Sequence, residues 1–228
     1  HEVAHALGFS SSHFTKFVDG VTGSPLGLSK VMQTTTERGR TVTKIITRKV
    51  VDAVKEHFNC DNWASAGAEI EDGGGAGTGG SHWERRVFYN EFMTGASVLN
   101  PIYSDITLAL FEDSGWYRAD RTQAQFLAWG FRAGCGFPQE KCSTWPTTYF
   151  CKQQQQQSCS YDYLYKTQCS LSTSSTDLPL FHQYFTDPKQ GGYSQLLDYC
   201  PVHMPRQDGS CQNEGPYLAY NSDGLFGG

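Results

Sequence analysis

The stretch His1-Glu2-Val3-Ala4-His5-Ala6-Leu7-Gly8-Phe9 decides how the rest of the chain is interpreted. Its pattern indicates a helix, on which His1 and His5 share one face so that both imidazoles can reach a single ion. Glu2 lies about 100° around the helix, where it can accept a proton from water at an open coordination position. H-E-x-x-H therefore predicts a zinc hydrolase site. The alternative is coincidence, or a surface helix with two solvated histidines.

A catalytic zinc ion also needs a third protein ligand. The chain offers five further histidines: His13, His57, His82, His182 and His203. His57 lies in an amphipathic segment, where a role on the helix surface or at a cap is the ordinary expectation. Gly8 should turn the chain away before His13, and the two histidines of the C-terminal part have no supporting pattern.

His82 has the stronger context, because it follows a flexible glycine run and precedes Met93 in Asn90-Glu91-Phe92-Met93-Thr94-Gly95. A methionine in a turn below a zinc site supplies an apolar, polarisable floor. Taken alone, Met93 would be interpreted as a core methionine.

Composition limits the function classes. The 228 residues are 38% hydrophobic and 18% charged, which is apolar enough to bury a core and excludes a disordered chain. The net charge of −5 and the lack of a large basic patch argue against binding of nucleic acid. No apolar run is long enough to span a membrane.

The eight cysteines predict disulfides. Seven of them follow residue 130, in a segment rich in Ser, Thr, Gln and Tyr, and no C-x-x-C pair suggests a metal site instead. We therefore expect an oxidising compartment, with the pairing left open. A change of composition near residue 134 predicts a domain boundary there.

Hydrophobic periodicity predicts four helical segments. They span residues 1–10, 45–58, 102–114 and about 121–129. Between them, six of the nine residues at 72–80 are glycine, and Gly75, Gly77 and Gly80 match the G-x-G-x-x-G dinucleotide fingerprint. Without a strand-turn-helix unit around it that signal is weak, and a pliant loop that delivers His82 to a metal is the better interpretation.

Five segments together resemble the leishmanolysin-like metallopeptidases, a branch of the metzincins. They are HEVAHALGF at 1–9, IEDGGGAGTGGSHWERR at 70–86, NEFMTG at 90–95, LALFEDSGWYRAD at 108–120, and WGFRAGCGF at 129–137 with KC at 141–142. The resemblance is continuous over about residues 1–151. Most metzincins place the third histidine where this chain has Ser11, whereas leishmanolysin-like proteins place it after a long insertion.

The resemblance implies a role for each matched residue. His1, His5 and His82 would bind one Zn²⁺ ion, with Glu2 as the general base. Met93 would be the residue of the methionine turn, and Gly8 would let the chain leave the helix so that His82 can approach. The implied activity is endopeptide hydrolysis of protein or peptide substrates, with a role in cell adhesion; a non-catalytic adhesion protein on the same fold is the alternative.

The implied fold class is α+β, mainly helical and loop-rich. Residues 1–134 would be the C-terminal part of a metzincin catalytic domain, without its N-terminal sheet subdomain, and 135–228 a cysteine-rich, disulfide-stapled region. Because the sequence starts inside a motif, we expect a fragment that alone binds zinc weakly and cleaves peptides poorly. The full-length protein would be extracellular or associated with the cell surface or membrane. Its oligomeric state stays open.

A third interpretation takes His1 as a mature N-terminus. Its terminal amine and imidazole, with one more histidine, could bind copper as in oxidative polysaccharide enzymes. This interpretation leaves Glu2, His5 and Met93 without a role.

Overall fold

A computed structural model describes residues 1–210 and divides the chain into two compact units. Unit 1 comprises residues 1–140, and unit 2 begins at Lys141. The division falls after the expected boundary between residues 134 and 135. Cys135 belongs to unit 1, because it forms a disulfide with Cys60.

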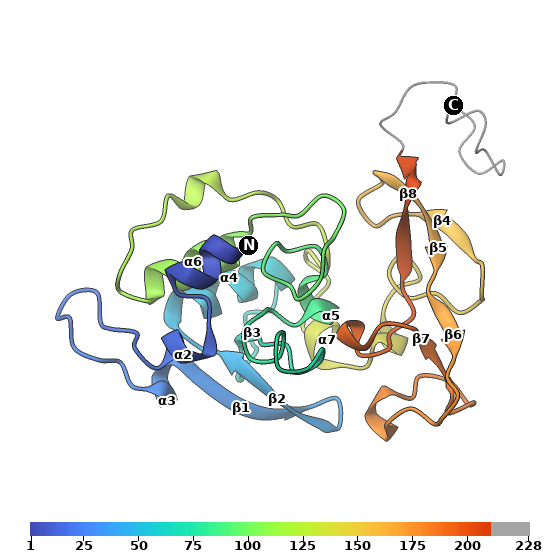
Figure 1. Ribbon diagram of the computed structural model, residues 1–228, viewed down its shortest axis with the longest axis horizontal. Helices are drawn as coiled ribbons and strands as arrows, with labels where there is room; N and C mark the ends of the chain where they lie inside the picture. Colours follow the sequence, from blue (N-terminus) through green and yellow to red (C-terminus); the bar gives the residue numbers. More distant parts are fainter. Residues whose placement is uncertain (211–228) are drawn as a thin grey trace. The chain divides into compact units, whose positions relative to one another are not determined.

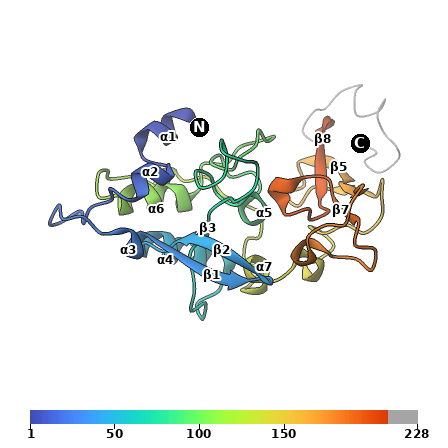
Figure 2. The same cartoon turned by 60° about the horizontal axis from the view of Figure 1, so that its bottom comes forward.

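Unit 1 combines short helices with a three-stranded sheet. Its α-helices are α1 (Glu2–Leu7), α2 (Ser11–Phe14), α3 (Leu28–Val31), α4 (Arg48–Phe58), α5 (Arg85–Phe88), α6 (Asp105–Asp113) and α7 (Gly136–Gln139), with a 3-10 turn at Arg121–Gln123. Its strands are β1 (Met32–Glu37), β2 (Arg40–Ile45) and β3 (Ala68–Glu69), antiparallel in the order β1-β2-β3. Figures 1 and 2 show α1 and the β1–β2 hairpin on opposite sides of this unit.

The expected helix at 45–58 is wrong at its start. Ile45 ends β2, where it is fully buried and pairs with Met32 and Ala68, and α4 begins only at Arg48. Two consecutive isoleucines fit a buried strand as well as a helix, so periodicity could not separate them. The tight turn at Arg38-Gly39 joins β1 to β2, and both residues have positive φ.

The two later helices are shorter than the segments that hydrophobic periodicity predicts, 102–114 and about 121–129. α6 starts after Ser104, whose hydroxyl accepts a hydrogen bond from the backbone N–H of Thr107. The expected helix at about 121–129 is only the 3-10 turn, because the chain is extended from Ala124. The core of unit 1 lies where α4 and α6 pack together, and it is strongly aromatic: Phe9, Phe14, Phe17, Phe58, Trp83, Phe88 and Trp129 are buried.

Unit 2 is built from strands and 3-10 turns. Its strands are β4 (Gln157–Cys159), β5 (Tyr165–Cys169), β6 (Leu171–Thr173), β7 (Gln190–Gly192) and β8 (His203–Ser210), in two antiparallel sheets of orders β4-β5-β8 and β6-β7. Its 3-10 turns are Cys142–Thr144, Leu180–His182 and Gln195–Leu197. The chain is thus mixed rather than mainly helical, because the part of unit 2 that the structure describes holds no α-helix.

Disulfides are confirmed in both units. Cys60–Cys135 lies within unit 1, and Cys142–Cys200 and Cys151–Cys169 lie within unit 2. Of the two other cysteines, Cys211 falls outside the described residues. Within residues 1–210, no helix combines the length and the apolar character that a membrane crossing requires.

Candidate metal centre

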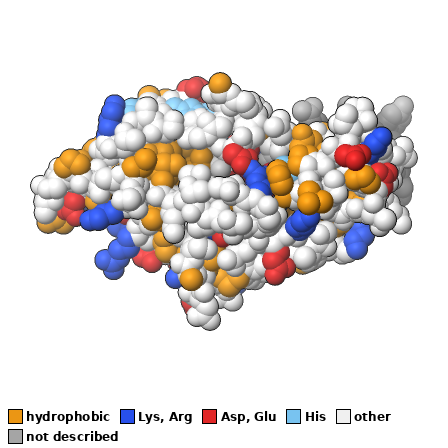
Figure 3. Space-filling view, turned by 90° about the horizontal axis from the view of Figure 1, so that it is seen from below, with side chains coloured by type: hydrophobic (Ala, Val, Ile, Leu, Met, Phe, Trp, Pro, Cys, Tyr) orange, Lys and Arg blue, Asp and Glu red, His pale blue; other side chains and the backbone are white. Residues whose placement is uncertain are grey.

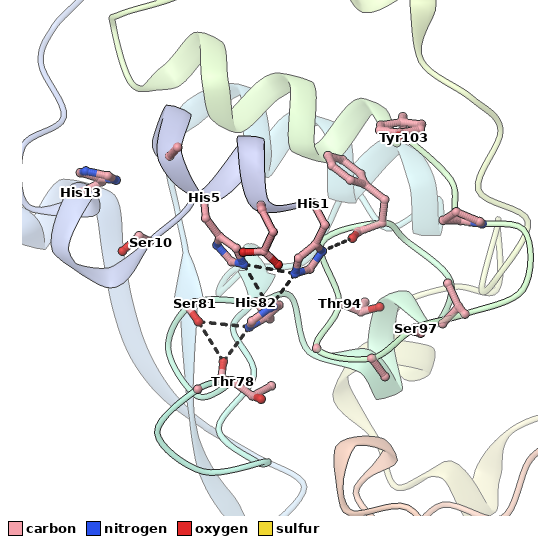
Figure 4. A pocket seen from close by; sticks show the side chains of 18 residues that line it. His1, His5, Ser10, His13, Thr78, Ser81, His82, Thr94, Ser97 and Tyr103 are labelled. Atoms are coloured by element: carbon pink, nitrogen blue, oxygen red, sulfur yellow. Dashed lines mark hydrogen bonds between the residues drawn. The ribbon is translucent and has the colours of Figure 1, made fainter.

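Three histidines meet at one end of α1. The Nε2 atoms of His1 and His82 are 3.0 Å apart, those of His5 and His1 3.2 Å, and those of His5 and His82 3.3 Å. Figure 4 shows the three rings converging from α1 and from the segment that follows the glycine-rich loop. The structure therefore brings together the three histidines that the sequence analysis selected.

Each ring is held by a backbone carbonyl on its far side. The Nδ1 atoms of His1, His5 and His82 lie 2.7, 2.7 and 2.9 Å from the carbonyl oxygens of Phe92, Phe9 and Thr78. Because a carbonyl oxygen only accepts, each Nδ1 donates its proton, and each Nε2 turns a lone pair toward the other two. Three lone pairs facing one another repel unless a cation lies between them.

This donor set fits a zinc ion. Two nitrogens bound to tetrahedral zinc at ~2.0–2.1 Å lie about 3.3–3.4 Å apart, close to the separations in the cluster. A metal-bound histidine usually donates its second N–H to an oxygen acceptor, which is the arrangement at all three rings. Burial lowers the pKa of His82 below the ordinary histidine value, which favours the neutral form that binds metals.

Gly8 ends α1 and positions the acceptor of His5. Its φ of 147° is unfavourable for other residues, and a Cβ there would lie 3.1 Å from the ring of Trp116. The turn directs the carbonyl of Phe9 back to the His5 ring. Gly8 thus ends α1 at Leu7, earlier than the expected helical segment 1–10, and it also fixes an acceptor that no sequence pattern indicated.

The glycine-rich loop returns the chain to its starting point. The backbone N–H of Glu71 donates to His82 O at 2.9 Å, and that of Gly80 donates to Glu71 O at 2.8 Å. Trp83 then pairs with Ile70. The loop is close-packed on the turn after Met93, since a Cβ at Gly95 would lie only 2.1 Å from the Thr78 side chain. The glycines of the dinucleotide fingerprint lie in the long loop between β3 and α5, so they do not form the tight turn of a strand-turn-helix unit.

Glu2 and Met93 take different positions around the cluster. Glu2 is exposed and lines a cleft of about 920 Å³ that contains the three histidines. Met93 is fully buried, and the residues on either side of it, Phe92 and Thr94, line the same cleft. Histidine side chains also reach the surface at the upper edge of the space-filling view (Figure 3).

The cleft extends to both sides of the cluster. Ser10 and His13 lie on one side and Ser97 and Tyr103 on the other (Figure 4). His13 thus lines the cleft, although it does not belong to the cluster of three. Sequence reasoning set His13 aside because Gly8 should turn the chain away before it, and it assigned no role to Ser10, Ser97 or Tyr103.

The remaining histidines make structural contacts. His57 Nε2 donates to Trp129 O at 2.9 Å, and burial lowers the pKa of His57 to about 4. In unit 2, His182 Nε2 lies 3.0 Å from the carboxylate of Asp198, and His203 Nε2 donates to Thr147 O at 3.1 Å. A separate acidic cluster, Glu71, Asp72 and Glu84, also lies close enough to share an ion, but Glu71 and Glu84 accept from backbone N–H groups and Asp72 pairs with Arg40.

Comparison with known proteins identifies the family. The sequence model of the leishmanolysin family, peptidase M8, matches residues 1–223. The chain is 37% identical to a leishmanolysin homolog of Crithidia fasciculata, over 92% of this chain and 31% of that protein. It is 36% identical to leishmanolysin of Leishmania donovani, over 97% of this chain and 37% of that protein.

An animal relative matches as well. The chain is 35% identical to the leishmanolysin-like peptidase of Drosophila melanogaster, over 88% of this chain and 36% of that protein. The chain thus spans about a third of the length of the curated relatives it matches. With the matched residues and the histidine cluster together, the chain belongs to the leishmanolysin family, a family of metalloproteases.

Proposed function

We propose that this chain carries the zinc site of a metalloendopeptidase, in which His1, His5 and His82 bind one Zn²⁺ ion and Glu2 is the general base. One observation carries the proposal: three Nε2 atoms converge at 3.0 to 3.3 Å while each Nδ1 is committed to a carbonyl. Membership of a metalloprotease family supports the same conclusion.

When bound, zinc supplies Lewis-acid chemistry that makes water more acidic and a carbonyl more electrophilic. The chain's own residues hold and move the proton. The exposed carboxylate of Glu2, in the cleft beside the histidines, accepts a proton from the attacking water and passes it to the leaving amine. The water oxygen bonds to the carbonyl carbon, the C–N bond breaks, and the products are a carboxylic acid and an amine, which become a carboxylate and an ammonium group when the remaining proton moves to the amine.

The cleft favours protein or peptide substrates. It is open to solvent and runs past the histidines from His13 to Tyr103, which gives room for a chain on both sides of a scissile bond. Glu2 further favours catalysis over a purely adhesive role, because adhesion has no use for a proton acceptor beside the metal. We take the fold of unit 1 as the C-terminal part of a metzincin catalytic domain.

The disulfides support the compartment that we propose for the protein. Three disulfides in the described residues require oxidising conditions, which favour an extracellular or cell-surface location for the protein. Membrane association and a contribution to adhesion belong to the same proposal. Labelling of the protein on intact cells by a membrane-impermeant reagent tests the location, and labelling only after lysis contradicts it.

The decisive experiment separates metal binding from catalysis in the native protein that contains this chain. H82A should lose zinc, whereas E2A should keep about one zinc per chain and lose at least ~10²-fold in the rate of peptide cleavage. H13A is the matched control for zinc content, because His13 lies in the cleft but outside the cluster. Copper in place of zinc, or full cleavage by E2A, would sink the proposal.

A further inference from the structure

Glu91 is a buried carboxylate two residues before Met93. It is fully buried, and its two oxygens accept hydrogen bonds from the backbone N–H of Met93 at 2.6 Å and from the hydroxyls of Thr107 and Ser104 at 2.5 and 2.8 Å. Burial raises the pKa of this carboxyl to about 7, and the hydrogen bonds oppose the shift. No step of the proposed reaction uses this group.

One end of this arrangement leads to His82. Thr107 Oγ1, which donates to Glu91, accepts from the indole N–H of Trp83 at 2.8 Å. The backbone N–H of Trp83 donates to Met93 O at 3.0 Å, which closes a ring of contacts back to Glu91. Trp83 directly follows His82, so the ring holds the peptide that carries this histidine.

The other end leads to His1. Phe92 lies between Glu91 and Met93, and its carbonyl oxygen accepts the proton of His1 Nδ1 at 2.7 Å. The hydrogen bond from Met93 N–H to the Glu91 carboxylate spans Phe92 and therefore fixes the direction of that carbonyl. The carboxylate of Glu91 is thus linked by hydrogen bonds to the segments that hold His1 and His82, two of the three histidines.

We propose that Glu91 is a positioning residue of the metal centre, which sets the orientation of His1 through the Phe92 carbonyl and the placement of His82 through Thr107 and Trp83. The inference rests on the proposed zinc site. It also accounts for a costly feature, because burying a carboxylate disfavours folding unless converging donors offset the loss of water. Here all the donors belong to the segments around the metal centre or to the start of α6.

The test measures metal binding, with zinc and cobalt(II) as probes and the native protein as the sample. E91Q should bind zinc about 10- to 100-fold more weakly, as is typical when an outer partner of a metal ligand is lost. The absorption spectrum of the cobalt-substituted protein should change as well, because the ligand rings reorient. T107V keeps the side-chain shape but breaks the link to Trp83, and it should show a smaller loss of the same kind.

E37Q is the matched control. Glu37 is also a buried carboxylate, but it pairs with Lys44 in the β1–β2 hairpin, away from the histidine supports. It should lose stability with an unchanged zinc affinity and cobalt spectrum. T107V decides the outcome if E91Q fails to fold.

The possible failures are distinguishable. Wild-type zinc affinity and an unaltered cobalt spectrum in both E91Q and T107V would overturn the role of Glu91 alone. An equal loss of affinity in E37Q would also overturn it, because the effect would then be general destabilisation. A wild-type protein that binds no zinc would overturn the proposed function, and the role of Glu91 with it.

Discussion

At the scale of single residues, the candidate site depends on which nitrogen of each histidine carries the proton. Carbonyl acceptors at Phe9, Thr78 and Phe92 set all three rings alike, with the lone pairs inward. A free imidazole in water exchanges between two tautomers. Because these contacts fix one tautomer and one ring orientation, they remove an entropic cost of metal binding. Main-chain acceptors also resist mutation, because every residue type supplies a carbonyl.

The pH dependence of Glu91 is a prediction at this scale. Burial raises its pKa from 4.5 to about 7, so between these values the folded state keeps a proton that the unfolded state releases. Folding therefore weakens as pH rises through this window, by up to about 3 kcal/mol at ~1.4 kcal/mol per pKa unit. Because E91Q has no such proton, its stability relative to the wild type should increase by that order from pH 5 to pH 8.

Urea unfolding of the metal-free proteins at several pH values measures this difference. The wild type and E91Q differ only at position 91, so the difference between their curves reports on Glu91. Parallel stability curves for the wild type and E91Q would contradict a raised pKa for Glu91.

At the scale of elements, α4 and α6, which pack together in the core of unit 1, are joined by a helix cap that α6 provides for α4. The α4 N-cap residue, Thr47, makes no side-chain cap hydrogen bond. Instead, the carboxylate of Asp113, at the end of α6, accepts from the backbone N–H groups of Lys49 and Val50 at 2.7 and 3.1 Å. A negative charge at a helix N-terminus also interacts favourably with the helix dipole.

Removal of this cap should loosen the pair of helices. D113A should lower the free energy of unfolding by about 0.5–2 kcal/mol, the usual cost of losing an N-terminal cap. D113N keeps an acceptor oxygen and should lose less. The exposed Asp52 of α4 provides the control, and D52A should change stability by less than about 0.5 kcal/mol in denaturant unfolding. Equal effects of D113A and D52A would show that the cap contributes nothing.

At the scale of the whole molecule, the two units have separate covalent frameworks. Each disulfide in the described part of the chain joins two cysteines of the same unit, and none joins unit 1 to unit 2. The histidine cluster belongs entirely to unit 1. A ligand stabilises only the structure that it binds, by about 2.7 kcal/mol at a hundredfold excess over its Kd. Zinc should therefore stabilise unit 1 and leave unit 2 unchanged.

Hydrogen exchange with and without a chelator tests this prediction. Removal of zinc should lower amide protection within residues 1–140, and protection within residues 141–210 should stay the same. H82A should already show the low protection and should not respond to the chelator. A uniform loss across both units would mean that the metal stabilises the molecule as one cooperative body.

The sequence determined by itself the family, the disulfide-rich character and the choice of His1, His5 and His82 as candidate ligands. The family and the disulfides can be inferred because residue identity carries the chemistry, and His1 and His5 can be selected as candidates because helical spacing places them together without any tertiary contact. Element limits were less accurate, as at Ile45, where burial in a sheet overrode a helical pattern.

Only the tertiary structure decided how the candidate ligands are held. The approach of His82 to His5 spans 77 residues, and it depends on a loop that closes on Glu71. The acceptor carbonyls and the positioning role of Glu91 could not be identified from the sequence. Every residue has a backbone carbonyl, and residue identity does not show whether a glutamate is buried or exposed. Residues far apart in the sequence come close only through packing. The H-E-x-x-H motif therefore identifies His1, Glu2 and His5 as candidates, whereas the fold brings His82 to them.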